Sequence, residues 1–534
     1  MTQPRTLGVV GAGTMGAGIA QLGCAAGMRT LLHDPQPTAL DAGLERVRGG
    51  LAKWVEKGRA DGRAGELLSP AATLEQLAGC ELVIEAAPER LELKRELFAA
   101  LSRVVGAEAV LASNTSSIPV TAIASAAARP QNVVGMHFFN PPPLMRLLEL
   151  IRAEQTGQHA LDVARAAGEA MGKDVILAVD GPGFLVNRCA RPFAGEALRL
   201  LTERIASPEQ IDRICRLGGG FKMGPFELMD LVGVDVNFDV AKSFAELSFG
   251  EPRWRPSPLQ ARLVAAGRLG RKTGRGWYEY RDGAHRPADP APLGPGGGEG
   301  RVVLIEGRGR LAHELRERAV AAGFALRETA EPTGAQPELI VDATVHSTTR
   351  HATPVDTTAD PAAAMLGIDP AATTDASRST AGPEPTGAPT GGPLRVLLCA
   401  DRPLAALGEP HAVGFHLLPP LAESRLVELT RLPSTPDASA DAAERFFAAL
   451  GFHAEWVGDA PGLVLGRIVC QLVNEGMFAV GEGVGSAADV DAGLTLGLAH
   501  PRGALAWGEA IGREHVLATI DGLWEERHEE RYRA

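Results

Sequence analysis

The chain has 534 residues, too many for a single hydrophobic core, and this length suggests about three to five domains. Its composition, 45% hydrophobic and 22% charged, is that of an ordinary globular protein, and the net charge of −12 argues against nucleic acid or a membrane surface as the main partner. No stretch approaches about 20 apolar residues, so no membrane span is expected. The six cysteines are scattered without CxxC pairing, so neither a metal site nor a disulfide framework is indicated. With no visible signal peptide, a cytoplasmic protein is expected.

The first predicted strand, residues 6–10, runs into a glycine-rich turn, Gly11-Ala-Gly13-Thr14-Met15-Gly16, and a helical pattern follows. Gly11 permits the tight turn, Gly13 lets the backbone approach a pyrophosphate, and Gly16 allows close packing of helix on strand. The helix N-terminus offers N–H groups to the phosphates. Asp34 follows the second predicted strand, residues 29–33, where its carboxylate can bind ribose hydroxyls and repel a 2′-phosphate. The alternative is a turn that binds nothing, but strand, motif, helix and acid in register favour a dinucleotide site for NAD.

Further predicted strands, at residues 82–86, 110–113 and 133–136, alternate with helical stretches. This alternation predicts an α/β fold of the Rossmann-like, doubly wound kind, with helices on both faces of a parallel sheet. From Pro182 to about Tyr280 the apolar spacing is helical. We therefore expect a dinucleotide-binding domain at residues 1–181, an all-α domain at 182–281, and a Pro/Gly-rich linker at 282–300.

The second half begins with another apolar strand at Arg301, followed by Gly307-Arg-Gly309-Arg-Leu-Ala312. Two arginines crowd this turn, and no clear acid ends a second strand, so a structural turn is favoured over a nucleotide site. Residues 351–393 are rich in Ala, Thr, Pro and Gly, which predicts a poorly ordered insertion. We expect a degenerate Rossmann-like domain at 301–457 and a second helical domain at 458–534.

The two halves are related by an internal repeat, and repeats change the interpretation of a whole fold. Gly135-Met-His-Phe-Phe-Asn-Pro and Gly414-Phe-His-Leu-Leu-Pro-Pro stand 279 positions apart, and about a hundred residues keep this offset without a gap. The matched pairs include His137 with His416, Glu149 with Glu428, Pro182-Gly183 with Pro461-Gly462, Asp212 with Asp491, and Gly233 with Gly512. The first copy has Asn140 and Asn187 where the second has Pro419 and Gly466. An active unit fused to a decayed one is predicted.

His137 follows a predicted strand, and Glu149 lies twelve residues further on. An imidazole oriented by a carboxylate is a sound general base, because the carboxylate fixes the tautomer and stabilises the imidazolium. Oxidation of an alcohol needs such a base for the hydroxyl proton. Taken alone, a His and a Glu are more often a structural pair, so the surrounding motifs decide.

Those motifs resemble the 3-hydroxyacyl-CoA dehydrogenase family over residues 6–281. The resemblance is carried by the glycine-rich turn, Ser113-Asn-Thr-Ser116-Ser, His137-Phe-Phe-Asn140-Pro, Pro182-Gly-Phe-Leu-Val-Asn187-Arg, Met223-Gly-Pro-Phe-Glu-Leu-Met-Asp230 and Gly270-Arg-Lys272-Thr-Gly-Arg-Gly-Trp-Tyr. It implies that His137 is the catalytic base and Glu149 its partner, with Ser116 and Asn187 holding the substrate against His137. It also implies that Glu89, Lys94, Asn140 and Lys272 line the NAD site.

An acyl-CoA substrate follows from the same resemblance, since the family binds CoA with a helical arm after the second strand. In this chain the arm carries a basic cluster that suits an anionic nucleotide tail, although a solvated helix face explains it nearly as well: Arg46, Arg48, Lys53, Lys57 and Arg59.

The C-terminal tail looks like the end of two-unit bacterial enzymes that oxidise 3-hydroxybutyryl-CoA or, in the phenylacetate pathway, 3-hydroxyadipyl-CoA. Ser116 has no counterpart in Cys399-Ala-Asp-Arg-Pro, so the second unit is expected to be catalytically dead. Single-unit relatives dimerise through the helical domain. The two helical domains of this chain are therefore expected to form an internal pseudo-dimer, with further homo-oligomerisation left open.

The predicted reaction is NAD-dependent oxidation of (S)-3-hydroxyacyl-CoA to 3-ketoacyl-CoA, in fatty-acid or aromatic-acid (phenylacetate) catabolism. Two alternatives remain: an acetoacetyl-CoA reductase working in the synthetic direction, and a non-catalytic NAD-binding structural protein. Acyl-chain length cannot be predicted from these residues.

Overall fold

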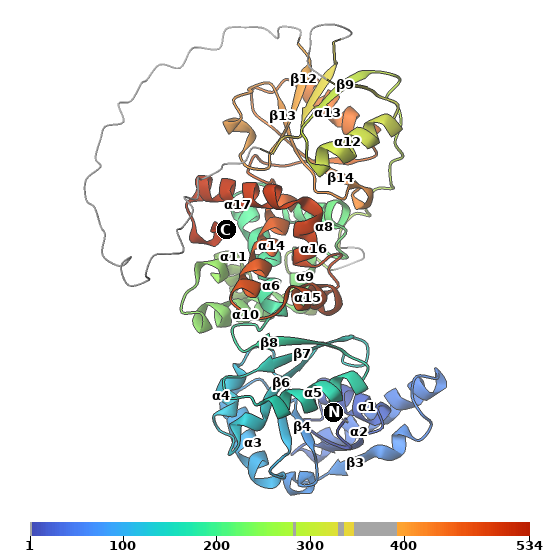
Figure 1. The fold of residues 1–534 in the computed structure, drawn as a ribbon, viewed down its shortest axis with the longest axis vertical. Coiled ribbons are helices and arrows are strands. Elements are labelled where there is room, and N and C mark those ends of the chain that lie inside the picture. Colours follow the sequence, from blue (N-terminus) through green and yellow to red (C-terminus); the bar gives the residue numbers. More distant parts are fainter. Residues whose placement is uncertain (1–2, 281–284, 329–335, 346–391) are drawn as a thin grey trace, which may run out of the picture.

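The computed structural model describes residues 3–280, 285–328, 336–345 and 392–534. Two sheets lie at opposite ends of the long axis, and a body of helices lies between them (Figure 1). The chain forms the N-terminal sheet, then part of the helical body, then the second sheet, and finally returns to the helical body with its C-terminal helices.

The N-terminal sheet has eight strands in the order β3-β2-β1-β4-β5-β6-β7-β8. The strands are β1 (Thr6–Val10), β2 (Arg29–His33), β3 (Leu68–Ala71), β4 (Leu82–Glu85), β5 (Val110–Ser113), β6 (Val133–Phe138), β7 (Leu147–Arg152) and β8 (Asp174–Val179). The flanking helices are α1 (Thr14–Ala25), α2 (Pro37–Glu56), α3 (Leu91–Val104), α4 (Val120–Ala124) and α5 (Gln158–Ala170). The inner strands are nearly continuous apolar runs because helices cover both faces. The Rossmann-like prediction is confirmed.

Two features of this sheet were not predicted. Strand β3 is short and carries Pro70, so its sequence gives little strand signal. Strand β7 pairs antiparallel with β6, whereas the other strand pairs of the sheet are parallel. This reversal sets His137 directly opposite Glu149 in the register of the two strands.

The second sheet has seven strands in the order β10-β9-β11-β12-β13-β14-β15. They are β9 (Val302–Glu306), β10 (Ala325–Arg327), β11 (Leu339–Asp342), β12 (Leu394–Leu398), β13 (Val413–His416), β14 (Leu426–Arg431) and β15 (His453–Trp456), with helices α12 (Arg310–Ala321) and α13 (Asp437–Ala449). Over the described residues its order is that of the first sheet without a counterpart of β3, and β13 and β14 are again antiparallel. The predicted insertion falls almost entirely on residues outside the described ranges, as do residues 329–335, which follow β10.

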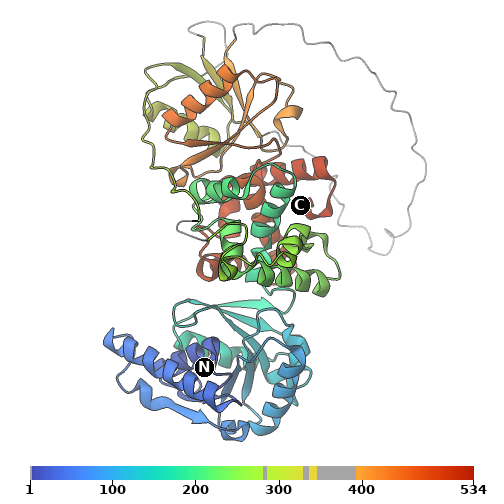
Figure 2. The ribbon, with the colours of Figure 1, turned by 180° about the vertical axis from the view of Figure 1, so that it is seen from behind.

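The helical body draws on both halves of the chain. The first half supplies α6 (Val186–Cys189), α7 (Arg191–Thr202), α8 (Pro208–Gly219), α9 (Pro225–Val232), α10 (Val234–Leu247) and α11 (Pro258–Ala265). The second half supplies α14 (Leu465–Gly481), α15 (Ala487–Ala492), α16 (Ala504–Ile511) and α17 (Arg513–Arg527). Helix α14 packs on α7 inside one apolar cluster that mixes both halves. From behind, the green helices of the first half and the red helices of the second half are interleaved (Figure 2).

Contacts across this body occur in reciprocal pairs. Arg188 contacts Glu475 and Glu482, both at 2.8 Å, and Arg467 contacts Glu196 at 2.8 Å and Glu203 at 2.6 Å. The repeat offset of 279 positions relates the two sets, because it matches Arg188 to Arg467 and each glutamate of one set to a glutamate of the other. The backbone hydrogen bonds from Val179 to Val484 (2.8 Å) and from Gly458 to Ile205 (2.7 Å) are related in the same way. The two helical sets are thus related by an approximate two-fold exchange.

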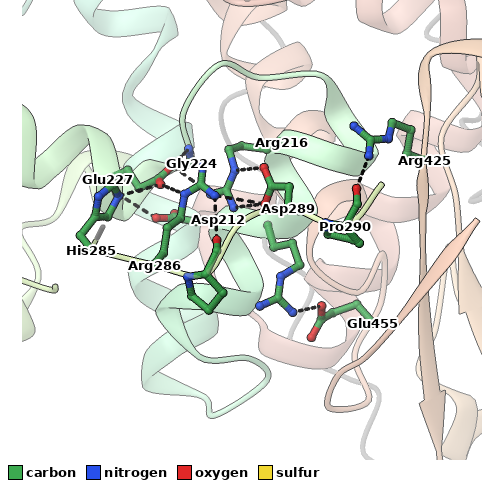
Figure 3. A network of polar contacts seen from close by, with 12 residues as sticks. Asp212, Arg216, Gly224, Glu227, His285, Arg286, Asp289, Pro290, Arg425 and Glu455 are labelled. Atoms are coloured by element: carbon green, nitrogen blue, oxygen red, sulfur yellow. Dashed lines mark hydrogen bonds and ion pairs between the residues drawn. The ribbon is translucent and has the colours of Figure 1, made fainter. Parts of the chain in front are cut away.

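The segment predicted as a linker is held by polar contacts over its described residues, 285–300. His285 and Arg286 contact Glu227, and Asp289 pairs with Arg216 at 2.8 Å (Figure 3). The carbonyl of Pro290 accepts a hydrogen bond from Arg425 in the second half. This part of the chain therefore lies along the helical body rather than forming a free linker, because His285, Arg286 and Asp289 contact side chains of that body.

Candidate active site

A cavity of about 380 Å³ lies where the carboxyl ends of β4, β5 and β6 meet the start of α6. In parallel sheets of this kind, ligands bind beyond the carboxyl ends of the strands. The cavity is lined by Met15, Ala86, Ala87, Glu89, Asn114, Ser116, His137, Phe138, Phe139, Asn140, Asn187 and Leu498.

His137 and Glu149 form a buried pair at the base of this cavity. The Nδ1 atom of His137 lies 2.9 Å from Oε2 of Glu149, which is fully buried. The other ring nitrogen, Nε2, has no hydrogen-bond partner among the described residues, and the ring is 6% exposed at the cavity. When Nδ1–H donates its hydrogen bond to Glu149, the imidazole is held in the tautomer whose Nε2 can accept a proton.

The second oxygen of Glu149 ties this pair to the helical body. Oε1 accepts the backbone N–H groups of Leu185 (2.8 Å) and Val186 (3.1 Å) at the start of α6. The next residue, Asn187, lines the cavity. One buried carboxylate therefore sets the orientation of His137 and the position of Asn187 together.

Glu89 holds the loop that carries Ser116. Its Oε1 accepts the hydroxyl of Thr115 (2.6 Å) and the backbone N–H of Ser116 (3.0 Å), and Lys94 lies 3.2 Å from Oε2. Burial raises the pKa of the Glu89 carboxyl, but the charge of Lys94 and the hydrogen bonds of Thr115 and Ser116 outweigh it and hold the pKa below its ordinary value. Glu89 therefore stays ionised and fixes the loop.

The predicted cofactor residues divide into two groups. Met15, Glu89 and Asn140 line the cavity, with the turn residue Thr14 next to Met15 at the start of α1. Lys94 is only 1% exposed and lies 2.7 Å from buried Glu85. It therefore contacts Glu89 from the protein interior rather than lining the site.

Lys272 lies apart from this cavity. Its Nζ pairs with Asp235 at 2.6 Å within the helical body, and the residue is absent from the cavity wall. The prediction that Lys272 lines the cofactor site is therefore not supported by this structure, because the Lys272 ammonium group forms an ion pair with Asp235 outside the cavity.

The glycine-rich turn has the shape that a dinucleotide needs. Gly11 has φ 102°, and a Cβ there would lie 2.6 Å from the carbonyl oxygen of Ala86. A Cβ at Gly16 would lie 1.8 Å from the carbonyl oxygen of Gly11, so helix α1 can pack this closely only with glycine. Gly13, by contrast, faces open space at the N-terminus of α1, where a pyrophosphate can approach the backbone.

Asp34 stands immediately after β2, as predicted. Its two carboxylate oxygens accept backbone N–H groups of Ala12 (2.9 Å) and Gln36 (3.0 Å), which fixes the acid beside the turn. A carboxylate at this position repels the 2′-phosphate of NADP.

The basic arm is helix α2 and the residues just after it. Two of its five cations are already engaged: Arg46 donates to the carbonyl of Ala12 (2.7 Å), and Arg48 pairs with Glu45 (2.8 Å). Arg46 thus braces the glycine-rich turn. The other three, Lys53, Lys57 and Arg59, are exposed, and a role for them in CoA binding stays a prediction.

The second half keeps His416 and Glu428 opposite each other in its sheet, but the two side chains are not hydrogen-bonded. Glu428 uses both carboxylate oxygens for the backbone N–H groups of Val464 (2.7 Å) and Leu465 (3.0 Å). The His416 ring turns instead to His515, with 3.2 Å between the Nε2 atoms.

Gly466 is the physical reason for this arrangement. A Cβ at Gly466 would lie 2.2 Å from Cε1 of His416, so the ring fills the space that the Asn187 side chain takes in the first half. Burial, with a smaller contribution from His515, lowers the pKa of His416 well below its ordinary value. The ring is therefore a neutral core group.

Leu498 is the cavity residue from the second half, and sequence reasoning missed it. It comes from the second half, immediately after the short π-helix Gly493–Gly497, which packs on β7 and α6. A Cβ at Gly497 would lie 2.7 Å from Leu147, and one at Gly493 would lie 2.9 Å from Val186, so glycine at both positions permits this close contact without displacing either side chain. No local motif marks a residue that reaches a site some three hundred positions earlier in the chain.

This geometry places the protein among the dinucleotide-dependent dehydrogenases that pair a Rossmann-like domain with a helical one. Residues 6–181 match the model of the 3-hydroxyacyl-CoA dehydrogenase NAD binding domain, and residues 183–280 and 462–534 match the C-terminal domain of the same family. The chain therefore belongs to the 3-hydroxyacyl-CoA dehydrogenase family, and it is an NAD-dependent oxidoreductase.

The similarity to a two-unit relative extends over the full length. The chain is 32% identical to 3-hydroxyadipyl-CoA dehydrogenase of Escherichia coli K12 over 537 residues, covering 100% of this chain and 96% of that protein. The crystal structure of 3-hydroxybutyryl-CoA dehydrogenase from Escherichia coli K12 matches with a TM-score of 0.78 at 29% identity, covering 99% and 96% of the two chains. A probable 3-hydroxybutyryl-CoA dehydrogenase of Bacillus subtilis is 42% identical over 279 residues, which are 51% of this chain and 96% of that protein. Among the described residues, no helix is long and apolar enough to cross a membrane.

Proposed function

We propose that the first half oxidises (S)-3-hydroxyacyl-CoA to 3-ketoacyl-CoA with His137 as general base. The observation that carries this is the 2.9 Å contact between Nδ1 of His137 and buried Glu149, which leaves Nε2 at the cavity. Nε2 takes the proton of the 3-hydroxyl group, and Glu149 stabilises the imidazolium that forms. When bound, NAD supplies the acceptor for the hydride that leaves carbon 3.

Ser116 and Asn187 hold the substrate in this proposal. Both line the cavity, and neither side chain has a hydrogen-bond partner within the described part of the chain, so both are free to bind the hydroxyl and thioester oxygens. Their positions are fixed through the carboxylates of Glu89 and Glu149. Such positioning contributes to rate because the reacting atoms must be held within about 3–3.5 Å of each other.

Replacement of Asn187 tests this role. Asn187→Ala should lower kcat/KM by about 10- to 100-fold, since one hydrogen bond to the reacting group is lost. The Kd for NADH, measured by fluorescence titration, should stay within about twofold. The matched control is Asn132→Ala, because Asn132 lies outside the cavity and bonds the carbonyl of Ala107. Equal kcat/KM in Asn187→Ala and wild type would remove Asn187 from the site.

Oxidation rather than synthesis is favoured by Asp34 beside the turn, because its carboxylate disfavours NADPH. We expect kcat/KM with NAD to exceed that with NADP by about 100-fold or more, a difference of about 3 kcal/mol. Initial rates with both cofactors at several concentrations measure this ratio. A preference for the phosphorylated cofactor would support the rival proposal of an acetoacetyl-CoA reductase.

The acyl group is the least determined part of the substrate. The relatives are named for 3-hydroxybutyryl-CoA and 3-hydroxyadipyl-CoA, so a short acyl chain, in fatty-acid or phenylacetate catabolism, is proposed for this chain too. Leu498 stands in the cavity wall and limits the space available. Leu498→Ala should raise kcat/KM for a C8 substrate relative to a C4 substrate by about tenfold, because a buried methylene is worth about 0.8 kcal/mol.

The control for this test is Leu517→Ala, since Leu517 is 41% exposed on the surface of α17. Kinetics over C4, C6 and C8 substrates and the 3-hydroxyadipyl thioester give the ratio for each variant. If Leu498→Ala kept the wild-type ratio, Leu498 would have no part in chain-length selection.

We also propose that the second half is a structural partner, so that the helical body is an internal pseudo-dimer. Three observations support this: the reciprocal Arg188 and Arg467 contacts, the loss of the hydrogen bond between His416 and Glu428, and the contribution of Leu498 to the first cavity. In this proposal one catalytic site serves the whole chain.

A further inference from the structure

A second cavity lies in the helical body, between α7, the segment around η4 (Pro252–Trp254) and the C-terminal η9 (Glu530–Tyr532). Its volume is about 180 Å³, and it shares no lining residue with the cavity around His137. Its charged lining residues are Arg191, Arg199, Arg253, Arg255, Arg531 and Glu203. Five guanidinium groups and one carboxylate thus face a space of small-molecule size.

Most of these cations are partly neutralised by carboxylates. Arg199 and Arg531 share Glu529, at 2.9 and 2.8 Å, and Arg253 lies 3.1 Å from Glu475. The one carboxylate in the wall, Glu203, is committed to Arg467 and Arg527. Pairing of this kind leaves little negative charge for the cavity itself.

Arg191 and the exposed Arg255 have no carboxylate partner among the described residues, and of the two only Arg191 is largely removed from solvent. Its guanidinium lies over the ring of Phe244, 5.2 Å from the centroid, and its buried Nε atom has no hydrogen-bond acceptor. Burial lowers the pKa of Arg191 to about 10, so the group remains charged near neutral pH. A partly buried guanidinium without a counter-ion is costly, since buried charges are normally paired.

Two further donors are left without acceptors in the same wall. Arg531 is 5% exposed and its Nη2 has no hydrogen-bond partner, and Trp254 is 8% exposed with an unpartnered indole N–H. Buried polar groups in native proteins are almost always hydrogen-bonded. Three donors without a hydrogen-bond partner, on α7, η4 and η9, therefore belong to residues that line one cavity.

The cavity is not a by-product of the repeated fold. The residue that matches Arg191 in the second half is Cys470, which is fully buried in α14. The residue that matches Arg253 is Tyr532, whose hydroxyl bonds Glu196 at 3.0 Å. Arginine at these two positions thus occurs in the first half alone, although the surrounding helices are repeated.

We infer that this cavity binds a small oxyanion, a carboxylate or phosphate group, with Arg191 as its principal counter-ion and Arg531 and Trp254 as further donors. A planar guanidinium offers paired N–H groups that match the oxygens of either group. The site is separate from the catalytic cavity and does not depend on the proposed function.

Thermal unfolding of the full chain tests this inference. Inorganic phosphate and malonate are added in separate series, each at ionic strength matched with chloride. The wild-type Tm should rise saturably with at least one of them, and the series that responds shows whether a phosphate or a carboxylate fits. Arg191→Gln should lose the response, with an apparent affinity at least about tenfold weaker. Its Tm in chloride should equal or exceed that of wild type, because an unpaired charge has been removed.

Arg262→Gln is the matched control, since Arg262 is an exposed arginine of α11 outside the cavity wall and should keep the full response. Arg531→Gln is the second cavity variant, and it should weaken the response as well. Retention of the wild-type response in both Arg191→Gln and Arg531→Gln would overturn the inference. So would the absence of a saturable Tm shift with either anion in the wild type.

Discussion

Replacing His137 with glutamine is expected to reduce kcat by about 10²- to 10⁴-fold, the range that a general base contributes. Glutamine can keep a hydrogen bond to Glu149, but it offers no basic nitrogen at the cavity in place of Nε2. The cavity and the glycine-rich turn should be preserved, so the Kd for NADH should change by less than about threefold. Steady-state kinetics and NADH fluorescence titration measure the two quantities on the same sample.

The matched control is His416→Gln, because His416 holds the corresponding position in the second half. His416 is buried against Gly466 and His515, so this variant should lose stability while the remaining folded protein keeps the wild-type kcat. Normal turnover in His137→Gln would remove His137 from the proposed chemistry. Loss of turnover in folded His416→Gln, with NADH binding retained, would show that the second half takes part in the reaction.

The largest effect on stability is expected from Arg467. This side chain is fully buried and contacts Glu196, Glu203 and the Tyr532 hydroxyl, at distances between 2.6 and 3.0 Å. Arg467→Met leaves Glu196, only 4% exposed, as a buried charge without its main partner. The free energy of unfolding should fall by about 3–5 kcal/mol, the usual cost of removing one member of a buried ion pair. Urea denaturation of the helical body, followed by tryptophan fluorescence, measures the change.

Two further variants identify the cause of that loss. In Arg467→Met combined with Glu196→Gln, part of the stability should return, because the uncompensated charge is removed. Arg431→Met is the exposed control, since Arg431 pairs with Asp437 on the surface and such pairs contribute about 0–1 kcal/mol. If Arg467→Met were no more destabilising than Arg431→Met, the reciprocal ion pairs would not hold the two halves together.

Local sequence patterns were sufficient for the N-terminal sheet and for much of its site. The strands at residues 6–10 and 29–33 have the predicted bounds, and the glycine-rich turn lies where strand meets helix. His137 and Glu149 were predicted as a pair, yet their contact depends on the antiparallel strand β7, which no local pattern announced. The residue types suggested the pairing, but the antiparallel alignment of β6 and β7 is what brings the two side chains together.

Predictions that depended on long-range contacts were less complete. Lys272 was expected near the cofactor but pairs with Asp235, and the segment expected as a linker binds Glu227 and Arg216. Leu498 was missed because its contact with the cavity joins two distant parts of the chain. Tertiary packing decides such contacts, and single-residue propensities contain no information about it.

The repeat showed that His416 is retained, but not that its hydrogen bond to Glu428 is lost. That loss follows from one substitution, Gly466 in place of Asn187, which opens the space that the His416 ring occupies. The substitution can be found by aligning the two repeats, whereas the displacement of the His416 ring can be seen only in the structure.

We expect each chain to have one catalytic site, formed in the first half and supported by the second. Isothermal titration calorimetry of the full chain with NADH, at known protein concentration, measures the number of NADH molecules bound per chain. One NADH should bind per chain. Binding should be abolished by Gly13→Trp, which fills the open space at the first turn, and unaffected by Gly309→Trp at the second. Two NADH molecules per chain, or loss of binding in the folded Gly309→Trp variant, would contradict this expectation.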